Sequence, residues 1–248
     1  MELAQITDVG LKRQSNQDQV GIFANQTGQK LLLLCDGMGG HNAGDVASEM
    51  ALFQVGHQWE EEGSIQSQDQ IKTWLDTAIK EANNRVREKA QQFMGLEGMG
   101  TTLIALTIYQ GQAIIAHVGD SRVYRFNQDT INQVTKDHSF VQELVDNAVI
   151  SEEEAATHPQ RNIVTRAIGT EADLTVDVQV IDLAADDILL LCSDGLSDML
   201  TQAQVIEILS QDTSIDQAAQ ALVESANASG GKDNISVILA RIEGGDMP

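Results

Sequence analysis

The apolar run at residues 31–35, Leu-Leu-Leu-Leu-Cys, most strongly limits what this chain can fold into, because Asp36 and Gly37 follow it directly. A short uninterrupted apolar run is typical of a strand buried on both faces, although a buried helix has the same signature. Glycine accepts the backbone angles of a sharp turn, so we expect Asp-Gly to end the strand. The Asp36 carboxylate would then lie at the rim of a rigid core, where an oxygen ligand suits a hard divalent cation. An ordinary Asp-Gly turn without a ligand is the alternative for this segment alone.

The overall charge narrows the classes of partner. The chain has 37 acidic and 15 basic residues, a formal net charge of −22, and 42% of its 248 residues are hydrophobic. This balance disfavours nucleic acid and anionic membranes, and an anionic substrate would need cations in the site. The apolar runs are too short for a bilayer and no secretory signal opens the chain, so we expect a cytoplasmic protein without membrane insertion. Cys35 and Cys192 each end an apolar run and are expected to be buried and reduced.

The order of the expected elements indicates an α+β fold. Strands are predicted at residues 2–7, 20–24, 31–35, 101–109, 112–118, 122–127, 131–134, 176–181, 188–192 and 235–240. Helices are predicted at residues 43–61, 68–93, 140–148, 151–157, 201–209 and 215–225. The strands between residues 101 and 134 are expected to form one antiparallel meander. The whole order predicts two antiparallel sheets packed face to face with helices outside, and residues 139–169 are expected to form an inserted flap.

Four aspartates share one context, the junction of an apolar strand with a glycine: Asp36, Asp120, Asp194 and Asp233. If these strand ends are neighbours, the carboxylates converge and repel, so protons or cations must compensate them. Ligation by oxygen alone suits Mg²⁺ or Mn²⁺, and the dispersed cysteines and histidines disfavour zinc. Five other aspartates lack this context and are expected at the surface: Asp129, Asp146, Asp173, Asp187 and Asp212.

Two neighbouring divalent ions would support phosphoryl-transfer chemistry. They can activate a water near neutral pH and offset the negative charge that develops at phosphorus. Arg13 can bind two phosphate oxygens with its planar guanidinium, although a solvated loop cation is the alternative. A water nucleophile needs no covalent phosphoenzyme. Arg161 and Arg166 in the expected flap could meet phosphate or acidic substrate residues, or could anchor the flap to the acidic body.

Six short motifs occur in the order found in metal-dependent protein phosphatases of the 2C type. They are Arg13-x-x-Asn16-x-Asp18, Asp36-Gly37-Met38-Gly39-Gly40-His41, Gly119-Asp120-Ser121-Arg122, Thr135-x-Asp137-His138-Ser139, Ser193-Asp194-Gly195-Leu196 and Asp233-Asn234. The chain therefore resembles that family over nearly its whole length, and most of all its compact bacterial branch.

The resemblance implies a four-layer αββα sandwich, a single domain over residues 1–248 with a flap at about 139–169, and a binuclear Mn²⁺ or Mg²⁺ centre. It implies that Asp36 bridges the ions, that the Gly37 carbonyl binds one ion, and that Asp194 and Asp233 complete the other: the implied set is Asp36, Gly37, Asp194 and Asp233. Asp18 would reach an ion through a bound water. Asp120 would join Asp194 at a third, weaker ion, and Arg13 would hold the substrate phosphate.

The resemblance also implies hydrolysis of phosphoserine and phosphothreonine in proteins, as part of signalling, by a monomer with a cognate Ser/Thr kinase. Animal members carry a histidine directly after Asp-Gly that is proposed as general acid, and Met38 occupies that position here. His41 could replace it, as could a metal-bound water, and a turn-stabilising role for His41 is the alternative. The competing functions are a non-catalytic pseudophosphatase or regulatory module of the same fold, and a Ca²⁺-stabilised structural domain.

The other four histidines are expected to be structural. His138 and His158 would anchor loops, His57 would lie on a helix surface, and His117 would lie in a strand within the core.

Overall fold

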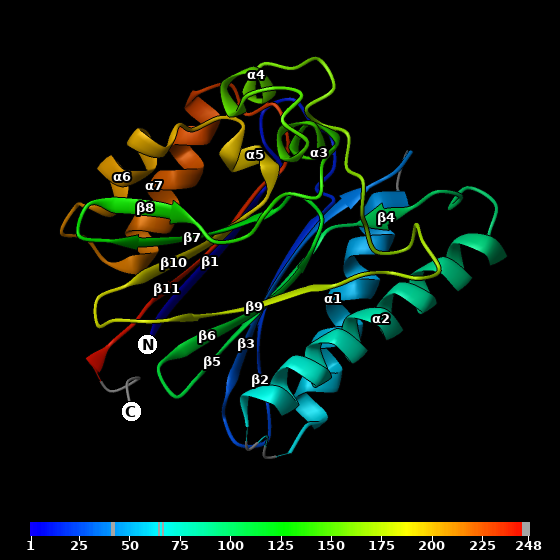
Figure 1. Cartoon of the computed structure of the whole chain (residues 1–248), viewed down its shortest axis with the longest axis horizontal. Coiled ribbons are helices and arrows are strands. Elements are labelled where there is room, and N and C mark those ends of the chain that lie inside the picture. Colours follow the sequence, from blue (N-terminus) through cyan, green and yellow to red (C-terminus); the bar gives the residue numbers. More distant parts are fainter. Residues whose placement is uncertain (41–42, 64, 66, 245–248) are drawn as a thin grey trace.

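Two antiparallel β-sheets lie face to face at the centre of the protein, and helices cover the outer face of each sheet (Figure 1). The computed structural model describes residues 1–40, 43–63, 65 and 67–244. The four layers confirm the predicted α+β sandwich of two sheets with flanking helices. No helix among the described residues is both long and apolar enough to cross a membrane.

Each sheet combines strands that are far apart in the sequence. The first sheet has the order β1 (Glu2–Asp8), β11 (Ile235–Arg241), β10 (Ile188–Cys192), β7 (Arg122–Asn127) and β8 (Thr130–Gln133). The second sheet has the order β2 (Asp18–Ala24), β3 (Lys30–Met38), β5 (Leu103–Tyr109), β6 (Gln112–Val118) and β9 (Asp177–Asp182), and β4 (Gly100–Thr101) pairs with β3. All pairings are antiparallel.

The helices divide between the two outer faces. The long helices α1 (Ala43–Glu61) and α2 (Gln68–Gln92) pack on the second sheet. The helices α5 (Asp194–Ser197), α6 (Gln202–Leu209) and α7 (Ile215–Ala228) pack on the first sheet. The short helices α3 (Phe140–Asp146) and α4 (Glu152–Ala156) lie at the top of Figure 1 and belong to the segment 139–169, which runs from the first sheet to the second and is the segment predicted to be a flap.

Strand β3 contributes to two hydrophobic cores because alternate side chains point to opposite faces. Leu31, Leu33 and Cys35 pack towards α1 and α2. Leu32 and Leu34 pack in the core between the sheets. Each leucine is completely buried, which is worth about 1.5–3 kcal/mol per side chain. The unbroken apolar run in the sequence therefore reflects a strand with no solvent face.

The prediction that Asp-Gly ends this strand is wrong. Strand β3 continues through Asp36 and Gly37 to Met38, and Gly37 pairs with Thr101 of β4. Gly37 is required for space rather than for a turn: a Cβ there would lie 2.1 Å from the Gly44 carbonyl oxygen. The helix α1 can therefore begin directly against the end of β3.

The predicted single meander is also wrong. Strands β5 and β6 form a hairpin in the second sheet, whereas β7 and β8 form a hairpin in the first sheet. The chain changes sheets at Gly119-Asp120-Ser121, between β6 and β7. This crossing places Asp120 where the two sheets meet, rather than at an exposed hairpin end.

Candidate metal centre

The aspartates predicted to converge line one cavity of about 260 Å³ between the sheets. The cavity is lined by Arg13, Gln17, Asp36, Gly37, Met38, Gly39, Thr102, Asp120, Asn162, Val164, Asp194 and Asp233. Every proposed metal ligand and the proposed phosphate-binding arginine are in this set. Asp18 lies beside the cavity, and His41 lies outside the described residues.

Asp36 follows the alternation of β3, so its side chain shares the face of Leu32 and Leu34 between the sheets. Asp18 of β2 is its direct cross-strand partner and is only 2% exposed. Burial raises the pKa of Asp36 well above its ordinary value, and the charges of Asp18 and Asp194 raise it further. Burial also raises the pKa of Asp18 to about 6. Two carboxylates in this position favour a proton or a cation between them.

Asp18 is oriented by a serine that the sequence patterns did not identify. The hydroxyl of Ser193 donates a hydrogen bond of 2.8 Å to Asp18 Oδ2 and accepts one of 3.0 Å from the backbone N–H of Ser236. Ser193 is the N-cap residue of α5, and Asp194 is the first residue of that helix. One strand-to-helix junction therefore positions two carboxylates. Ser193 directly precedes Asp194 in the motif Ser193-Asp194-Gly195-Leu196, and this position is the only feature of the sequence that could have identified it.

Asp194 follows β10 of the first sheet, and Asp120 lies in the crossing from β6 to β7 where the two sheets meet. Burial raises the pKa of Asp194 well above its ordinary value, and Asp120 and Asp233 are the next causes. Burial raises the pKa of Asp120 to about 6, and the charge of Asp137 adds to this effect. Burial and neighbouring carboxylates therefore both disfavour the ionised forms of Asp120 and Asp194 in the absence of a cation.

Asp233 forms an ion pair with Arg13. Arg13 Nη2 donates a hydrogen bond of 2.7 Å to Asp233 Oδ2, and this contact is the first cause of the raised pKa of Arg13. The arginine side chain is half exposed, so it can reach a ligand that enters from solvent. A solvated loop cation, the alternative for Arg13, would not make this hydrogen bond.

Asn234 holds the loop of residues 9–17, between β1 and β2, at three points and was also missed as a structural residue. Its Oδ1 accepts from the backbone N–H of Gln17, and its Nδ2 donates to the carbonyls of Val9 and Ser15. The side chain is buried, so these bonds are made without competition from water. Asn234 thereby fixes the loop that carries Arg13 against the strand that follows Asp233.

The donor set of the cavity fits hard divalent cations. Four carboxylates and a backbone carbonyl supply oxygen alone, which suits Mg²⁺ or Mn²⁺. The upward pKa shifts of Asp36, Asp120 and Asp194 are the electrostatic counterpart, because a cation would remove the repulsion that causes part of them.

A second cavity of about 380 Å³ separates the flap from α5. Asp120, Asp194 and Asp198 line it from the body, and residues of α3 and α4 line it from the flap.

Arg161 of the flap donates a 2.8 Å hydrogen bond to Asp198. Arg166 donates one of 2.8 Å to Asp177. Both arginines therefore anchor the flap to the acidic body, which was one of the two alternatives.

The remaining sequence predictions gave mixed results. His117 is buried in β6 and His57 is exposed on α1, as expected. Asp187 was expected at the surface, which is wrong: it is completely buried and forms an ion pair with Arg125. The charge of Asp187 is thus matched by a cation on the neighbouring strand β7, a partner that sequence spacing does not reveal.

The order of the site residues along the chain and their position in one cavity agree with a comparison of the chain with known protein families. The family model described as "Protein phosphatase 2C" matches residues 11–239. The chain belongs to the protein phosphatase 2C family. As a member of that family it is a protein-serine/threonine phosphatase with the sandwich of two antiparallel sheets described above.

Similar proteins and structures agree in length as well as in fold. The serine/threonine phosphatase stp of Listeria innocua is 44% identical over 233 residues, which cover 94% of this chain and 92% of the relative. The crystal structure of Stp1 from Staphylococcus aureus is 42% identical with a TM-score of 0.95, covering 98% of this chain and 95% of that one. The catalytic domain of the phosphatase PstP, solved in complex with two manganese ions, is 34% identical with a TM-score of 0.85 and 98% coverage of both chains.

Proposed function

We propose that this phosphatase hydrolyses phosphoserine and phosphothreonine in proteins with the help of two divalent cations, Mn²⁺ or Mg²⁺. The observation that carries the proposal is the single cavity lined by Arg13 and by four carboxylates from distant parts of the chain. The two manganese ions of the PstP structure support the choice of metal and the number of ions.

The donor groups divide naturally between the ions. Asp36 lies at the centre of the charge interactions, beside Asp18, Asp194, Asp120 and Asp233, so it is our candidate for the bridging ligand. The Gly37 carbonyl would complete one ion, and Asp194 and Asp233 would complete the other. Asp120 together with Asp194 would hold a third, weaker ion.

When bound, the two cations supply an activated water as the nucleophile and offset negative charge on the phosphoryl group. Asp18 accepts a hydrogen bond from Ser193 and would use its other oxygen to orient a water in the cavity. Arg13 would turn from Asp233 to the phosphate and bind two of its oxygens through its planar guanidinium. Either His41 or a water held at the cations would protonate the leaving serine or threonine oxygen.

A direct attack of water without a phosphoenzyme is consistent with the two cysteines of the chain. Cys35 and Cys192 are completely buried in the hydrophobic cores. Burial raises the pKa of the Cys192 thiol to about 12 and that of the Cys35 thiol further still. A buried protonated thiol is a poor nucleophile and has no route to a protein substrate.

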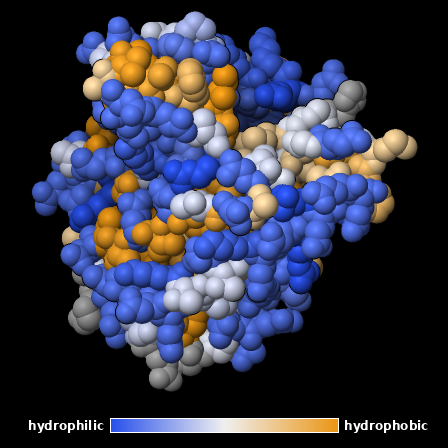
Figure 2. All heavy atoms as spheres, turned by 45° about the vertical axis from the view of Figure 1, so that its right-hand side comes forward, coloured by the Kyte–Doolittle hydropathy of each residue, from blue (hydrophilic) through white to orange (hydrophobic). Residues whose placement is uncertain are grey.

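We further propose that the enzyme acts as a cytoplasmic monomer opposite a cognate Ser/Thr kinase. Hydrophilic residues predominate on the face shown in Figure 2, and hydrophobic residues form separate patches there. Separate patches favour a monomer over an extensive interface. Light scattering coupled to size-exclusion chromatography measures the oligomeric state directly, and a stable dimer would contradict the proposed monomer.

The test of the proposed activity uses the full chain stripped of metal with a chelator. Phosphoserine and phosphothreonine peptides, with phosphotyrosine as comparison, are then assayed with and without Mn²⁺. We expect Mn²⁺-dependent release of phosphate from the first two and no acid-stable ³²P-labelled protein after quenching. Tight Mn²⁺ binding without turnover would instead favour the non-catalytic alternative, and binding of Ca²⁺ alone would favour the structural one.

A further inference from the structure

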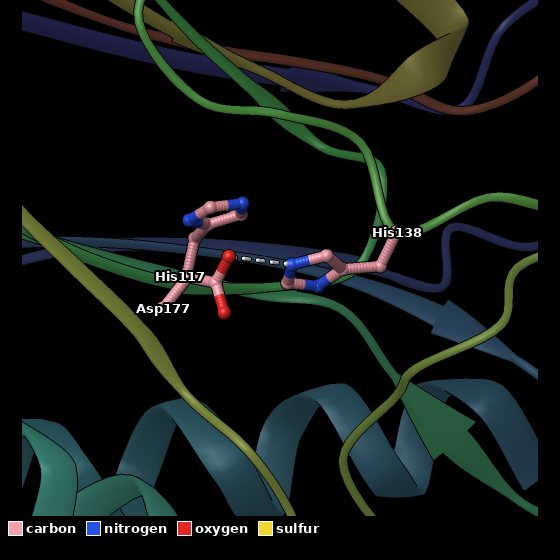
Figure 3. Close-up of side chains that lie close together, drawn as sticks. All are labelled: His117, His138 and Asp177. Atoms are coloured by element: carbon pink, nitrogen blue, oxygen red, sulfur yellow. Dashed lines mark ion pairs between the residues drawn. The ribbon is translucent and has the colours of Figure 1, made fainter. Parts of the chain in front are cut away.

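Two histidines and an aspartate form a cluster beside, and separate from, the candidate metal centre (Figure 3). His117 of β6 and Asp177 of β9 are direct cross-strand partners. The ring of His138, from the loop before the flap, stacks on the ring of His117 at 4.7 Å with an interplanar angle of 13°. His138 Nε2 lies 3.3 Å from Asp177 Oδ2. One ligand atom from each residue lies within 4.8 Å of the others, so the cluster could in principle gather around a metal ion.

The hydrogen bonds of the two rings show where their protons are. His117 Nε2 lies 2.9 Å from the carbonyl oxygen of Lys136, and a carbonyl only accepts, so Nε2 carries the proton. His138 Nδ1 accepts a hydrogen bond of 3.0 Å from the backbone N–H of Gly119, so this nitrogen is unprotonated. The proton of neutral His138 is therefore on Nε2, on the side of Asp177.

This arrangement of protons excludes His138 as a zinc ligand through Nε2. A ring nitrogen that carries a proton has no lone pair for a metal, and moving that proton to Nδ1 would set it against the N–H of Gly119 and lose that hydrogen bond. Burial lowers the pKa of His138 to about 4, so the ring is neutral at pH 7. The N–H at Nε2 makes no hydrogen bond of regular geometry, and its attraction to the Asp177 carboxylate at 3.3 Å is electrostatic.

His138 holds both backbone groups of Gly119. Its ring accepts from the Gly119 N–H, and its own backbone N–H donates a 2.9 Å bond to the Gly119 carbonyl. Gly119 has a φ of +108°, and a Cβ there would lie 2.5 Å from the Thr102 side chain. The turn at Gly119 is therefore a single conformation fixed from both sides, and Asp120 is the next residue.

The same histidine is tied to both ends of the flap. It directly precedes Ser139 at the start of the flap, and its backbone carbonyl accepts a 2.8 Å hydrogen bond from the N–H of Thr165 on the returning segment. The neighbouring Arg166 donates to Asp177 Oδ1, and Asp177 is the carboxylate beside His138 Nε2. Figure 3 shows Asp177 and the His138 ring facing each other across this contact.

We propose that His138 is a positioning residue that joins the base of the flap to the Gly119–Asp120 turn and thereby sets the Asp120 carboxylate in the metal centre. Asp177 and Arg166 orient the ring of His138 from the flap side. The role of Asp120 as a metal ligand rests on the proposed function above. The position of the proton on His138 and the clamp on Gly119 do not.

The first test uses the unaltered, metal-free protein. Two-dimensional ¹⁵N NMR of the histidine rings at pH 7.5 distinguishes the tautomers through the shifts of Nδ1 and Nε2. We expect His138 to carry its proton on Nε2, and we expect addition of Zn²⁺ to leave its ring signals unchanged. A proton on Nδ1, or stoichiometric Zn²⁺ binding by this ring, would overturn the proposal.

The second test replaces His138 by Asn and by Leu. Asn places an amide oxygen where Nδ1 accepts from Gly119, whereas Leu removes the acceptor. We expect His138→Leu to lower Mn²⁺ affinity at the weakest site roughly 10–100-fold, the usual effect of losing a group that orients a ligand, and to lower kcat with little change in KM. We expect His138→Asn to recover most of this loss. His57→Leu on the exposed surface of α1 is the matched control and should change neither quantity.

Hydrogen exchange of the Gly119 amide gives a readout that does not depend on metal or turnover. It should be slow in the unaltered protein and in His138→Asn, and fast in His138→Leu. Equal effects of Leu and Asn, or slow exchange in His138→Leu, would contradict the positioning role. If His138→Leu does not fold, Asp177→Asn takes its place, and normal Mn²⁺ affinity and kcat in that variant would contradict the proposed role of Asp177. A protein that passes the tautomer and exchange tests but binds no Mn²⁺ would refute only the proposed metal centre.

Discussion

Asp18 and Asp36 lie directly opposite each other on the antiparallel strands β2 and β3, on the face of the second sheet that meets the first sheet. Side chains opposite each other on neighbouring strands are only about 5 Å apart at their Cβ atoms. Two ionised carboxylates at that distance repel, and burial strengthens the repulsion. Without a cation, the ionised forms of Asp18 and Asp36 therefore destabilise the folded state, and a bound cation removes this repulsion.

The metal-free protein should be more stable at mildly acidic pH than at pH 7.5. The pKa of Asp18 is raised to about 6 in the folded protein, against an ordinary value near 3.9, so the folded state binds its proton more tightly than the unfolded state. This contribution is complete below about pH 4 and is lost as the pH rises through about 6, with a difference on the order of 3 kcal/mol. Urea unfolding in the presence of chelator at pH 5 and 7.5 captures about half of this difference, roughly 1.4 kcal/mol, because the folded and unfolded states differ by less than one bound proton at pH 5.

Asp18→Asn is the matched variant for this effect, since it keeps the shape and removes the charge. Its free energy of unfolding without metal should change less between pH 5 and 7.5 than that of the unaltered protein, and should exceed it at pH 7.5. An unchanged pH dependence in Asp18→Asn would show that the stability change has another origin.

Gly119→Ala should lower stability by about 2–4 kcal/mol, because a positive φ and a contact of 2.5 Å with Thr102 act together. Gly28→Ala is the matched control: its φ is +84°, but a Cβ there has nothing within 4 Å. That control should cost about 1 kcal/mol from backbone strain alone. Equal losses for the two variants, measured by urea unfolding, would show that space at Gly119 is unimportant.

Arg13→Ala should raise KM for a phosphoserine peptide by about 10–100-fold, since hydrogen bonds to a charged group contribute about 1.5–3 kcal/mol. Arg13→Lys should recover part of this, because lysine keeps the charge without the planar pair of donors. Lys12→Ala, the exposed neighbouring cation, should leave KM within about twofold, in line with the small effect of exposed charges. A KM for Arg13→Ala equal to that of Lys12→Ala would remove Arg13 from the phosphate site.

The sequence predicted the features that a local pattern determines. The unbroken apolar run at residues 31–35 is the buried part of β3, and the helix expected at residues 151–157 contains α4. It could not predict which sheet each hairpin joins, because a two-residue period is identical in either sheet. The crossing at Gly119 depends on packing against Thr102, which lies 17 residues earlier in the chain.

The polar residues that support the site depend in the same way on distant partners. Ser193 contacts Asp18 across 175 residues, and Asn234 contacts Val9 across 225. The burial of Asp187 needs Arg125 on another strand. The partners in each of these pairs are too far apart in the sequence for a local pattern to reveal the contact. The metal aspartates, by contrast, all lie where an apolar strand meets a glycine, and a local pattern can reveal that.

The most direct test of the metal centre is a calorimetric titration of Mn²⁺ into metal-free protein and into Asp36→Asn, with Asp212→Asn at an exposed position as control. We expect two strong sites in the unaltered protein and in the control. We expect Asp36→Asn to lose strong binding and, in parallel, phosphopeptide hydrolysis, while it keeps the folded structure by circular dichroism. Two strong sites and normal turnover in a folded Asp36→Asn would contradict the account.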